Sequence, residues 1–104
     1  MIVRGWRTGA PNLDTGAGFG IRIRSKDRDE YFDCKWNSVR IGLEDGLIVE
    51  ARISKTFWGK CPEIRSPQIG KWMLERRLAP WSDYHPPILN LEAIGDRYFR
   101  LSRC

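Results

Sequence analysis

Long apolar runs are missing from this sequence, and no stretch approaches the roughly 20 apolar residues that span a bilayer. The opening residues, MIVRGWRTGAP, also lack the apolar core of a signal peptide. We therefore expect a cytoplasmic protein without a membrane partner. Internal repeats are missing too, and 104 residues suit one domain but not two, so a single domain over residues 1–104 is expected.

Cysteine and histidine are scarce. The three cysteines, Cys34, Cys61 and Cys104, are odd in number and widely spaced, which argues against a disulfide framework. The single histidine, His85, forms no closely spaced ligand pair with them, so no metal site or other cofactor is predicted. A nucleophile–base pair of Cys61 and His85 is conceivable, but a free cysteine is more often a small buried hydrophobe. No catalytic residue is assigned; binding is favoured over catalysis, and the enzyme question stays open.

Phosphate-binding glycine motifs are also missing, although Gly16, Gly18 and Gly20 form a G-x-G-x-G run. No G-K-[ST] follows this run, and a strand is expected where a dinucleotide or P-loop fold needs a helix. Glycines that serve tight backbone turns are the favoured interpretation. A nest of backbone N–H groups that holds a phosphate is the alternative.

The sequence does contain one clear helix signal, within the stretch 57–81. Ser66 is a good N-cap, and Pro67 suits the first helical position. Apolar residues spaced three and four apart share one face of this helix, namely Ile69, Trp72 and Met73. Pro80 ends the pattern. We predict one amphipathic helix over residues 66–79, packed on a sheet.

Period-two alternation predicts strands on both sides of this helix. Residues 19–24 form one half-buried strand, and Ile2 with Val3 a brief edge strand. Residues 38–54 are predicted to form a hairpin around the three-residue loop Glu44-Asp45-Gly46. That loop length sets apolar side chains opposite apolar side chains and Arg40 opposite Glu50.

A second hairpin is predicted over residues 88–101, turned at Ile94-Gly95-Asp96, with Leu91 opposite Phe99. The chain then holds five or six short strands and one main helix. We therefore predict an α+β fold with a small antiparallel, barrel-like sheet. A sheet with one helix across its face is the alternative.

The chain is basic, with 18 Lys and Arg against 13 Asp and Glu and a formal net charge of +5. Arginine, the commoner cation, forks onto phosphates and stacks on bases. Where the apolar residues of a strand face inward, alternation sends its arginines outward together, which predicts a nucleic-acid-binding face with DNA or RNA as partner. Its predicted residues are Arg22, Arg24, Arg40, Arg52, Lys60 and Arg65. The simpler interpretation is a solvated face on which Arg40 pairs with Glu50.

Tryptophan is abundant, with five residues in the chain. Aromatic side chains line many ligand pockets, so the alternative hypothesis is a ligand- or protein-interaction module without catalysis. Its predicted pocket is lined by Trp58, Trp72, Trp81 and Tyr84. An exposed strand edge at residues 19–24 or 97–101 could also pair with a second copy to form a homodimer.

Three stretches, RTGAPNLDTGAGFGIRI, FWGKCPEIRSPQIGKWM and LAPWSDYHPP, resemble a set of small uncharacterised bacterial proteins, some of them carried on mobile gene cassettes. That resemblance covers most of the chain and implies no function. A second resemblance rests on the order of a hairpin, a helix with a buried Trp72, and a Gly95-Asp96 turn into the strand Phe99-Arg100-Leu101. This order is similar to the DNA-binding pseudobarrels of plant B3 domains and restriction-enzyme effector domains. In that family two basic strand arms clasp the major groove, so the resemblance implies a barrel and DNA as partner.

Overall fold

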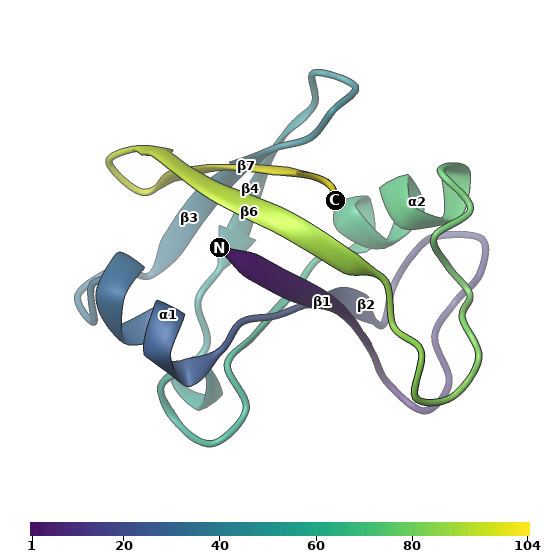
Figure 1. Cartoon of the computed structure of the whole chain (residues 1–104), viewed down its shortest axis with the longest axis horizontal. Helices are drawn as coiled ribbons and strands as arrows, with labels where there is room; N and C mark the ends of the chain where they lie inside the picture. The colour runs from purple at the N-terminus through teal and green to yellow at the C-terminus, as the bar shows by residue number, and fades with distance from the viewer.

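A computed structural model describes all 104 residues and shows one sheet of seven strands with two α-helices (Figure 1). The sheet curls into a nearly closed barrel, and α1 and α2 lie at its opposite ends. Neither helix is long and apolar enough to cross a membrane. In chain order the elements are β1 (Ile2–Arg7), β2 (Phe19–Arg22), α1 (Ser25–Tyr31), β3 (Ser38–Gly42), β4 (Ile48–Arg52), the 3₁₀ turn η1 (Lys55–Trp58), β5 (Glu63–Arg65), α2 (Pro67–Glu75), β6 (Ile88–Gly95) and β7 (Tyr98–Arg103).

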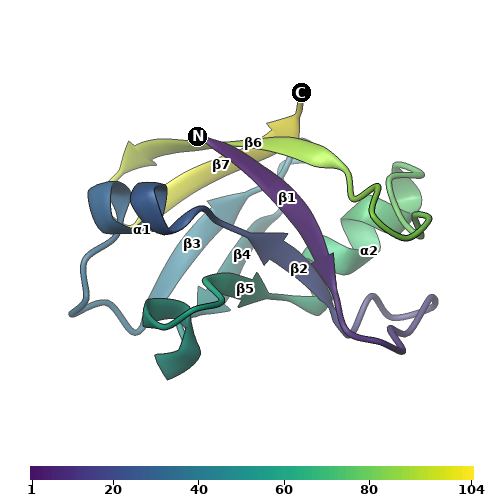
Figure 2. The ribbon, with the colours of Figure 1, turned by 60° about the horizontal axis from the view of Figure 1, so that its bottom comes forward.

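The strands are ordered β4-β3-β7-β6-β1-β2-β5 across the sheet. Figure 2 shows β5 beside β2, with β4 behind it, and the contact of β4 with β5 nearly closes the barrel. The predicted α+β class and barrel-like sheet are confirmed. The finer prediction is wrong: there are seven strands and a second helix, and β3 pairs with β7 in parallel. The sequence did not reveal β5 because its three residues are too few to show alternation. It did not reveal the parallel pair because such a pair joins strands that are far apart in the sequence.

The barrel interior is filled by aliphatic and aromatic side chains that alternate with outward polar ones. On β3, for example, Val39 and Ile41 are buried while Arg40 between them is exposed. The apolar face of α2 covers one end of the barrel with three buried side chains, Ile69, Trp72 and Met73. The predicted inward and outward faces of the strands and of this helix are confirmed.

α2 begins where the sequence predicts and ends earlier. The Ser66 hydroxyl accepts a hydrogen bond of 3.3 Å from the backbone N–H three residues on, and Pro67 is the first helical residue. The helix ends at Glu75 rather than at residue 79, because Arg77 adopts a left-handed conformation with φ of 59°. The N–H groups of Arg77 and its successor bond carbonyls of the last turn at 3.1 and 2.8 Å, a Schellman termination with arginine in place of the usual glycine.

The hairpin of β3 and β4 has the predicted register. Ile41 pairs with Val49, and Arg40 pairs with Glu50. Gly46, with φ of 91°, supplies the left-handed position of the loop, and the loop closes through a 2.8 Å bond between Leu43 N–H and the Leu47 carbonyl.

The hairpin of β6 and β7 has a register two residues away from the predicted one. Leu91 pairs with Leu101 rather than with Phe99. β6 continues to Gly95, the chain turns at residues 96–97, and a bulge near the end of β6 absorbs the extra residue. Both registers set apolar against apolar side chains, so the parity argument does not distinguish them.

Neither segment expected to offer an open strand edge does so. β2, which holds most of residues 19–24, pairs with β1 and β5, and β7 pairs with β3 and β6. Their backbone groups are already used within the sheet. The exposed strand edge predicted at residues 19–24 or 97–101 is therefore not formed, whereas the homodimer itself stays a prediction.

Two glycines let the loop between β1 and β2 approach the backbone of α2. A side-chain carbon on Gly16 would clash with the Pro67 carbonyl oxygen, and one on Gly70 would clash with the backbone of Gly16. Gly16 also has a φ of 81°, which L side chains rarely adopt. The structural interpretation of this glycine in the G-x-G-x-G run is confirmed.

Candidate nucleic-acid interface

The outer faces of β1 and β2 form the floor of a hollow. On β1, Val3 is buried in the barrel, whereas Arg4 is exposed and Trp6 half-buried on the outside. Arg4 lies directly opposite Arg22 of β2 in the strand register. Like charges at opposed positions destabilise a sheet, and of these two guanidiniums only that of Arg22 has a carboxylate partner, Glu63.

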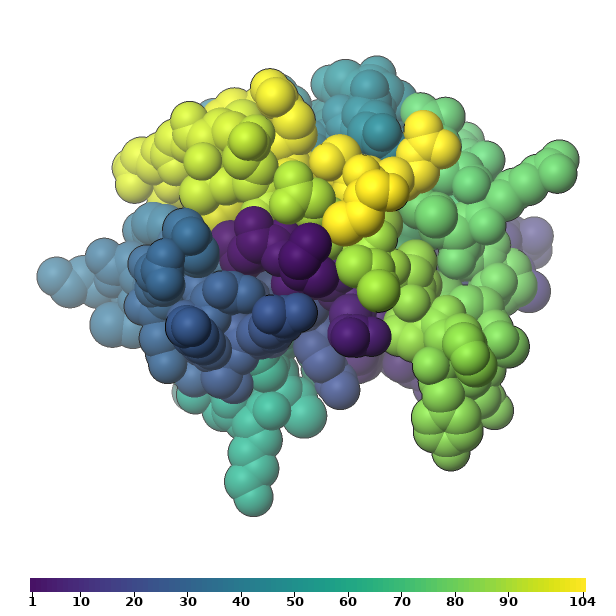
Figure 3. Space-filling view, viewed as in Figure 1, coloured from purple at the N-terminus to yellow at the C-terminus, as the bar shows by residue number.

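Two segments project on either side of this floor: residues 59–62 after η1, and the loop 80–87 (Figure 3). Two adjoining recesses, of 430 and 270 Å³, share Arg4 and Arg22 as lining residues. We call these two recesses together the basic hollow. Its cations are Arg4, Arg7, Arg22, Arg24 and Lys60. Its aromatic rings are Trp6, Trp81 and Tyr84.

No carboxylate lines the basic hollow. Two of its cations have carboxylate partners at the rim: Arg7 Nη2 lies 2.9 Å from Asp83 Oδ1, and Arg22 Nη2 lies 2.7 Å from Glu63 Oε2. The other three form no ion pair, namely Arg4, Arg24 and Lys60. The basic hollow therefore carries uncompensated positive charge, which raises the local concentration of anions.

Glu63 organises the arginines beside the basic hollow. It is only 8% exposed, and its two carboxylate oxygens face Arg22 at 2.7 Å and Arg65 at 3.7 Å. The Arg65 guanidinium also lies 4.6 Å from the centre of the Trp6 ring. Gly20 stands between Trp6 and Arg65 in the strand register, and a side-chain carbon there would clash with the backbone of Ile64 and Arg65. Two guanidiniums are thus held in fixed positions on the barrel surface.

The six residues predicted for a nucleic-acid-binding face fall into three places. Three line the basic hollow: Arg22, Arg24 and Lys60. Two line a neighbouring recess of 320 Å³ that also contains Glu63: Arg52 and Arg65. Arg40 lies apart on β3, with its guanidinium 5.6 Å from the centre of the Tyr98 ring.

All six side chains are exposed, as alternation predicts, but they do not share one flat surface. Because the sheet curves into a barrel, outward side chains on different strands point in different directions. The expected single face is therefore corrected to a band of cations across β1, β2, β5 and β4, with Arg40 outside it. Arg40 and Glu50 lie opposite in register without an ion pair, and Glu50 Oε1 instead accepts a 3.1 Å hydrogen bond from Ser38.

The aromatic residues of the alternative pocket do not come together. Trp72 is 1% exposed and belongs to the core, where its indole N–H has no partner. Trp58 lines a different hollow, beside α1. Only Trp81 and Tyr84 share a recess, the larger part of the basic hollow. The predicted pocket of four aromatic rings is not formed.

The structure adds no catalytic geometry. Cys61 and His85 are both exposed, and the His85 Nδ1 atom lies 2.9 Å from the Asp83 carbonyl oxygen. No hydrogen bond joins the thiol to the imidazole. Nowhere do three His, Cys, Asp or Glu side chains gather as metal ligands would.

Arg4 and Trp6 line the hollow but were not among the predicted residues. The signal for them is present in the sequence, since Val3 and Gly5 alternate with Arg4 and Trp6. The strand predicted there included only the first two of residues 2–7, because Gly5 weakens the pattern of a strand.

The fold and the basic hollow together define an α+β protein with a seven-strand, nearly closed barrel whose surface bears a cluster of cations and aromatic rings. No family model, curated protein or solved structure matches the chain.

Proposed function

We propose that this protein binds nucleic acid in the basic hollow. The observation that carries the proposal is a concave surface lined by five cations and three aromatic rings without a carboxylate. Guanidiniums neutralise phosphates, and aromatic faces stack on bases of any identity. The opposed Arg4 and Arg22 fit this function, because both line the hollow and Arg4 has no carboxylate partner that would compete with a phosphate.

The aromatic rings of the basic hollow differ in how firmly they are held. Trp81 packs on the buried Phe19, with ring centres 5.6 Å apart. Tyr84, at the tip of the loop 80–87, is 96% exposed. A base can therefore stack on Tyr84 without displacing any core contact, while the neighbouring arginines hold the backbone.

The resemblance to B3-like pseudobarrels points toward the same class of partner. The chain has a barrel-like sheet and a helix whose tryptophan, Trp72, is buried, which are features that the resemblance implies. A likeness of fold supports a function only by analogy, so the charges and rings of the basic hollow carry the weight of the proposal.

Fluorescence anisotropy with labelled single strands and duplexes of DNA and RNA, across a salt series, tests the proposal. The chosen variant is Arg24→Ala/Lys60→Ala, because both residues line the basic hollow and neither is in an ion pair, so their removal leaves no carboxylate unpartnered. We expect affinity to fall by about tenfold at low salt for all sequences alike. The slope of log affinity against log salt should become shallower by about two.

The matched control is Lys71→Ala/Arg76→Ala. It removes the same two charges from the exposed side of the α2 region, where neither residue is in an ion pair. Its affinity should stay within about twofold of the unmodified protein. Equal losses in the two double variants would mean that net charge alone drives binding, and no binding at low salt would overturn the proposal.

A further inference from the structure

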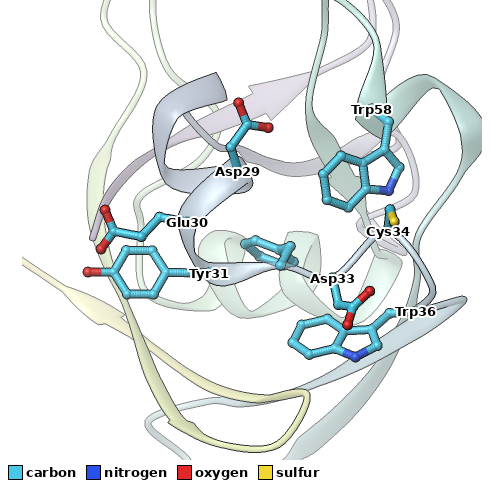
Figure 4. Close-up of a pocket in the computed structure, with 8 residues that line it drawn as sticks. Asp29, Glu30, Tyr31, Asp33, Cys34, Trp36 and Trp58 are labelled. Carbon is cyan, nitrogen blue, oxygen red and sulfur yellow. The ribbon is translucent and has the colours of Figure 1, made fainter.

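A second hollow, of 550 Å³, lies between α1 and the η1 turn, and we call it the acidic hollow (Figure 4). It is lined by the last residues of α1, the turn that follows, and Trp58. In Figure 4, Trp58 and Trp36 stand on the two sides of Cys34, and the Asp33 carboxylate lies beside the Trp36 ring. The Asp29 carboxylate projects from α1 above the same opening.

The two indoles of the acidic hollow are held by a chain of core aromatic rings. The Phe32 ring stacks on Phe99 with centres 4.7 Å apart, and it meets Trp36 at 6.1 Å and Phe57 at 5.0 Å, edge to face. Phe57 in turn contacts Trp58 at 5.4 Å. Rings in such a chain cannot move independently, so the shape of the acidic hollow is set before any ligand arrives.

The acidic hollow has the opposite charge from the rest of this basic protein. Its charged lining residues are all carboxylates: Asp29, Glu30 and Asp33. Asp29 is paired with Arg28 at 3.0 Å, but Glu30 and Asp33 form no ion pair. A hydrogen bond to Glu30 and the negative charge of that carboxylate raise the pKa of Tyr31.

Trp36 has no cation of its own. Three other partly exposed rings each carry an intramolecular guanidinium within 5.6 Å of the ring centre: Trp6, Trp58 and Tyr98. The half-buried Trp36 ring has a neighbouring carboxylate, Asp33, and no such partner. Trp36 is thus a half-buried ring beside a carboxylate that carries no cation of the protein itself.

We propose that the acidic hollow binds an organic cation of the methylated ammonium class against the Trp36 ring, beside the Asp33 carboxylate. Aromatic faces replace the weak hydration of methyl groups around such a cation, and a carboxylate at the rim balances its charge. One Asp33 oxygen already accepts a 2.9 Å hydrogen bond from the Lys35 N–H, which fixes the carboxylate and leaves its second oxygen for the ligand. The same chemistry occurs in a choline-type small molecule and in a methylated lysine side chain.

Titration with choline, with a trimethyllysine peptide and with 3,3-dimethylbutan-1-ol separates charge from shape. The alcohol has the shape of choline and no charge. We expect choline to bind with about millimolar affinity and to shift the indole N–H signal of Trp36 more than that of Trp58, whose ring already carries Arg28, in nitrogen-edited spectra, while the alcohol shifts neither. Tighter binding of the peptide identifies a lysine side chain as the source of the cation, and equal or weaker binding identifies a small molecule.

The variant Asp33→Asn keeps the acceptor of the turn and removes the charge. Its matched control is Asp45→Asn, because Asp45 Oδ1 accepts the same kind of turn bond, at 3.0 Å from the Leu47 nitrogen, far along the chain. We expect choline affinity to fall by about threefold in Asp33→Asn and by about fivefold in Trp36→Leu, with no change in Asp45→Asn. Equal binding of choline and the alcohol, or equal losses in the two asparagine variants, would overturn the proposal.

Discussion

The basic hollow and the acidic hollow both place partly exposed aromatic rings beside charged groups, but they anchor those rings differently. In the acidic hollow the indoles continue a chain of rings that reaches the core through Phe32. In the basic hollow Tyr84 stands on a loop that is tied to β1 by the ion pair of Arg7 with Asp83 and by backbone bonds. The acidic hollow is therefore preformed by packing, whereas the loop that carries Tyr84 is positioned by polar contacts that solvent can replace.

This difference fits the two kinds of ligand proposed. A small cation offers few contacts, so a hollow that binds it must be rigid beforehand. A nucleic-acid strand spreads its contacts over many phosphates and bases, so the adjustment of one loop costs only a small part of the binding free energy. The predictions below separate the two anchoring schemes.

The largest effect is expected for Phe32→Ala, which removes the centre of the aromatic chain. Phe32 is 7% exposed and touches three other rings. The free energy of unfolding should fall by about 3–5 kcal/mol, because the substitution leaves a cavity and also removes the contacts of the ring with its neighbours. Urea unfolding followed by tryptophan fluorescence measures it. A loss below about 1 kcal/mol would show that the chain does not anchor the acidic hollow.

The next effect is expected for Glu63→Gln, beside the basic hollow. The change leaves Arg22 and Arg65 without their buried carboxylate partner. Because both arginines are about half exposed, water recovers part of the interaction, and the loss of stability should be about 1–2 kcal/mol. Affinity for nucleic acid should rise by about twofold, since one negative charge leaves the rim.

Thermal unfolding and the anisotropy assay together check this variant. The control Glu92→Gln breaks an exposed pair with Arg100 at 4.0 Å and should change stability by less than about 0.5 kcal/mol. If Glu63→Gln lowers affinity instead, Glu63 orients the arginines and its charge is secondary.

A smaller effect is expected for Asp83→Asn, which breaks the ion pair between Arg7 and the residue next to Tyr84 in the loop 80–87. Asp83 is 79% exposed, so the stability should change by less than about 0.5 kcal/mol. Exchange of the loop amides with solvent deuterium should nevertheless become faster, while amides of α1 stay unchanged. Unchanged exchange in residues 80–87 would mean that packing, not the ion pair, positions this loop.

The smallest effect is expected in the titration of Tyr31, measured by phenolate absorbance. The hydrogen bond and negative charge of Glu30 raise the pKa of Tyr31 above its ordinary value of about 10, so Glu30→Gln should lower that pKa. In the pH range between the two values the folded state holds the proton more firmly than the unfolded state. The contribution of Tyr31 to stability is therefore complete below pH 10 and is lost as the pH rises through the raised pKa. An unchanged titration in Glu30→Gln would show that Glu30 does not set the potential of the acidic hollow.

Local parts of the fold could be predicted from the sequence, and long-range parts could not. The N-cap at Ser66 and the loop closed by Gly46 depend on residues a few positions apart, so their chemistry is visible in the chain. The early end of α2 at Arg77 was missed because a left-handed arginine carries none of the glycine signal. The parallel pairing of β3 with β7 leaves no local trace at all.

The candidate sites show the same division. Alternation predicts that Arg22 and Arg52 face outward, and they do. Arg24 and Lys60 line one recess with Arg4 because of the way the barrel closes. The spacing of residues along the chain does not predict that closure. The sequence does not predict the acidic hollow, because the charges of residues 25–30 nearly cancel along the chain, whereas only carboxylates of this stretch line the recess.

β7 lies in the middle of the sheet, between β3 and β6, although it is formed by residues 98–103. Without it the barrel would fall into a lone β3–β4 hairpin and a separate group of four strands. The acidic hollow, built on Phe99 of β7 through Phe32, would be lost with it, whereas the strands beneath the basic hollow would keep all their partners. During refolding, the acidic hollow should therefore form only when β7 inserts into the sheet, whereas the basic hollow can form earlier.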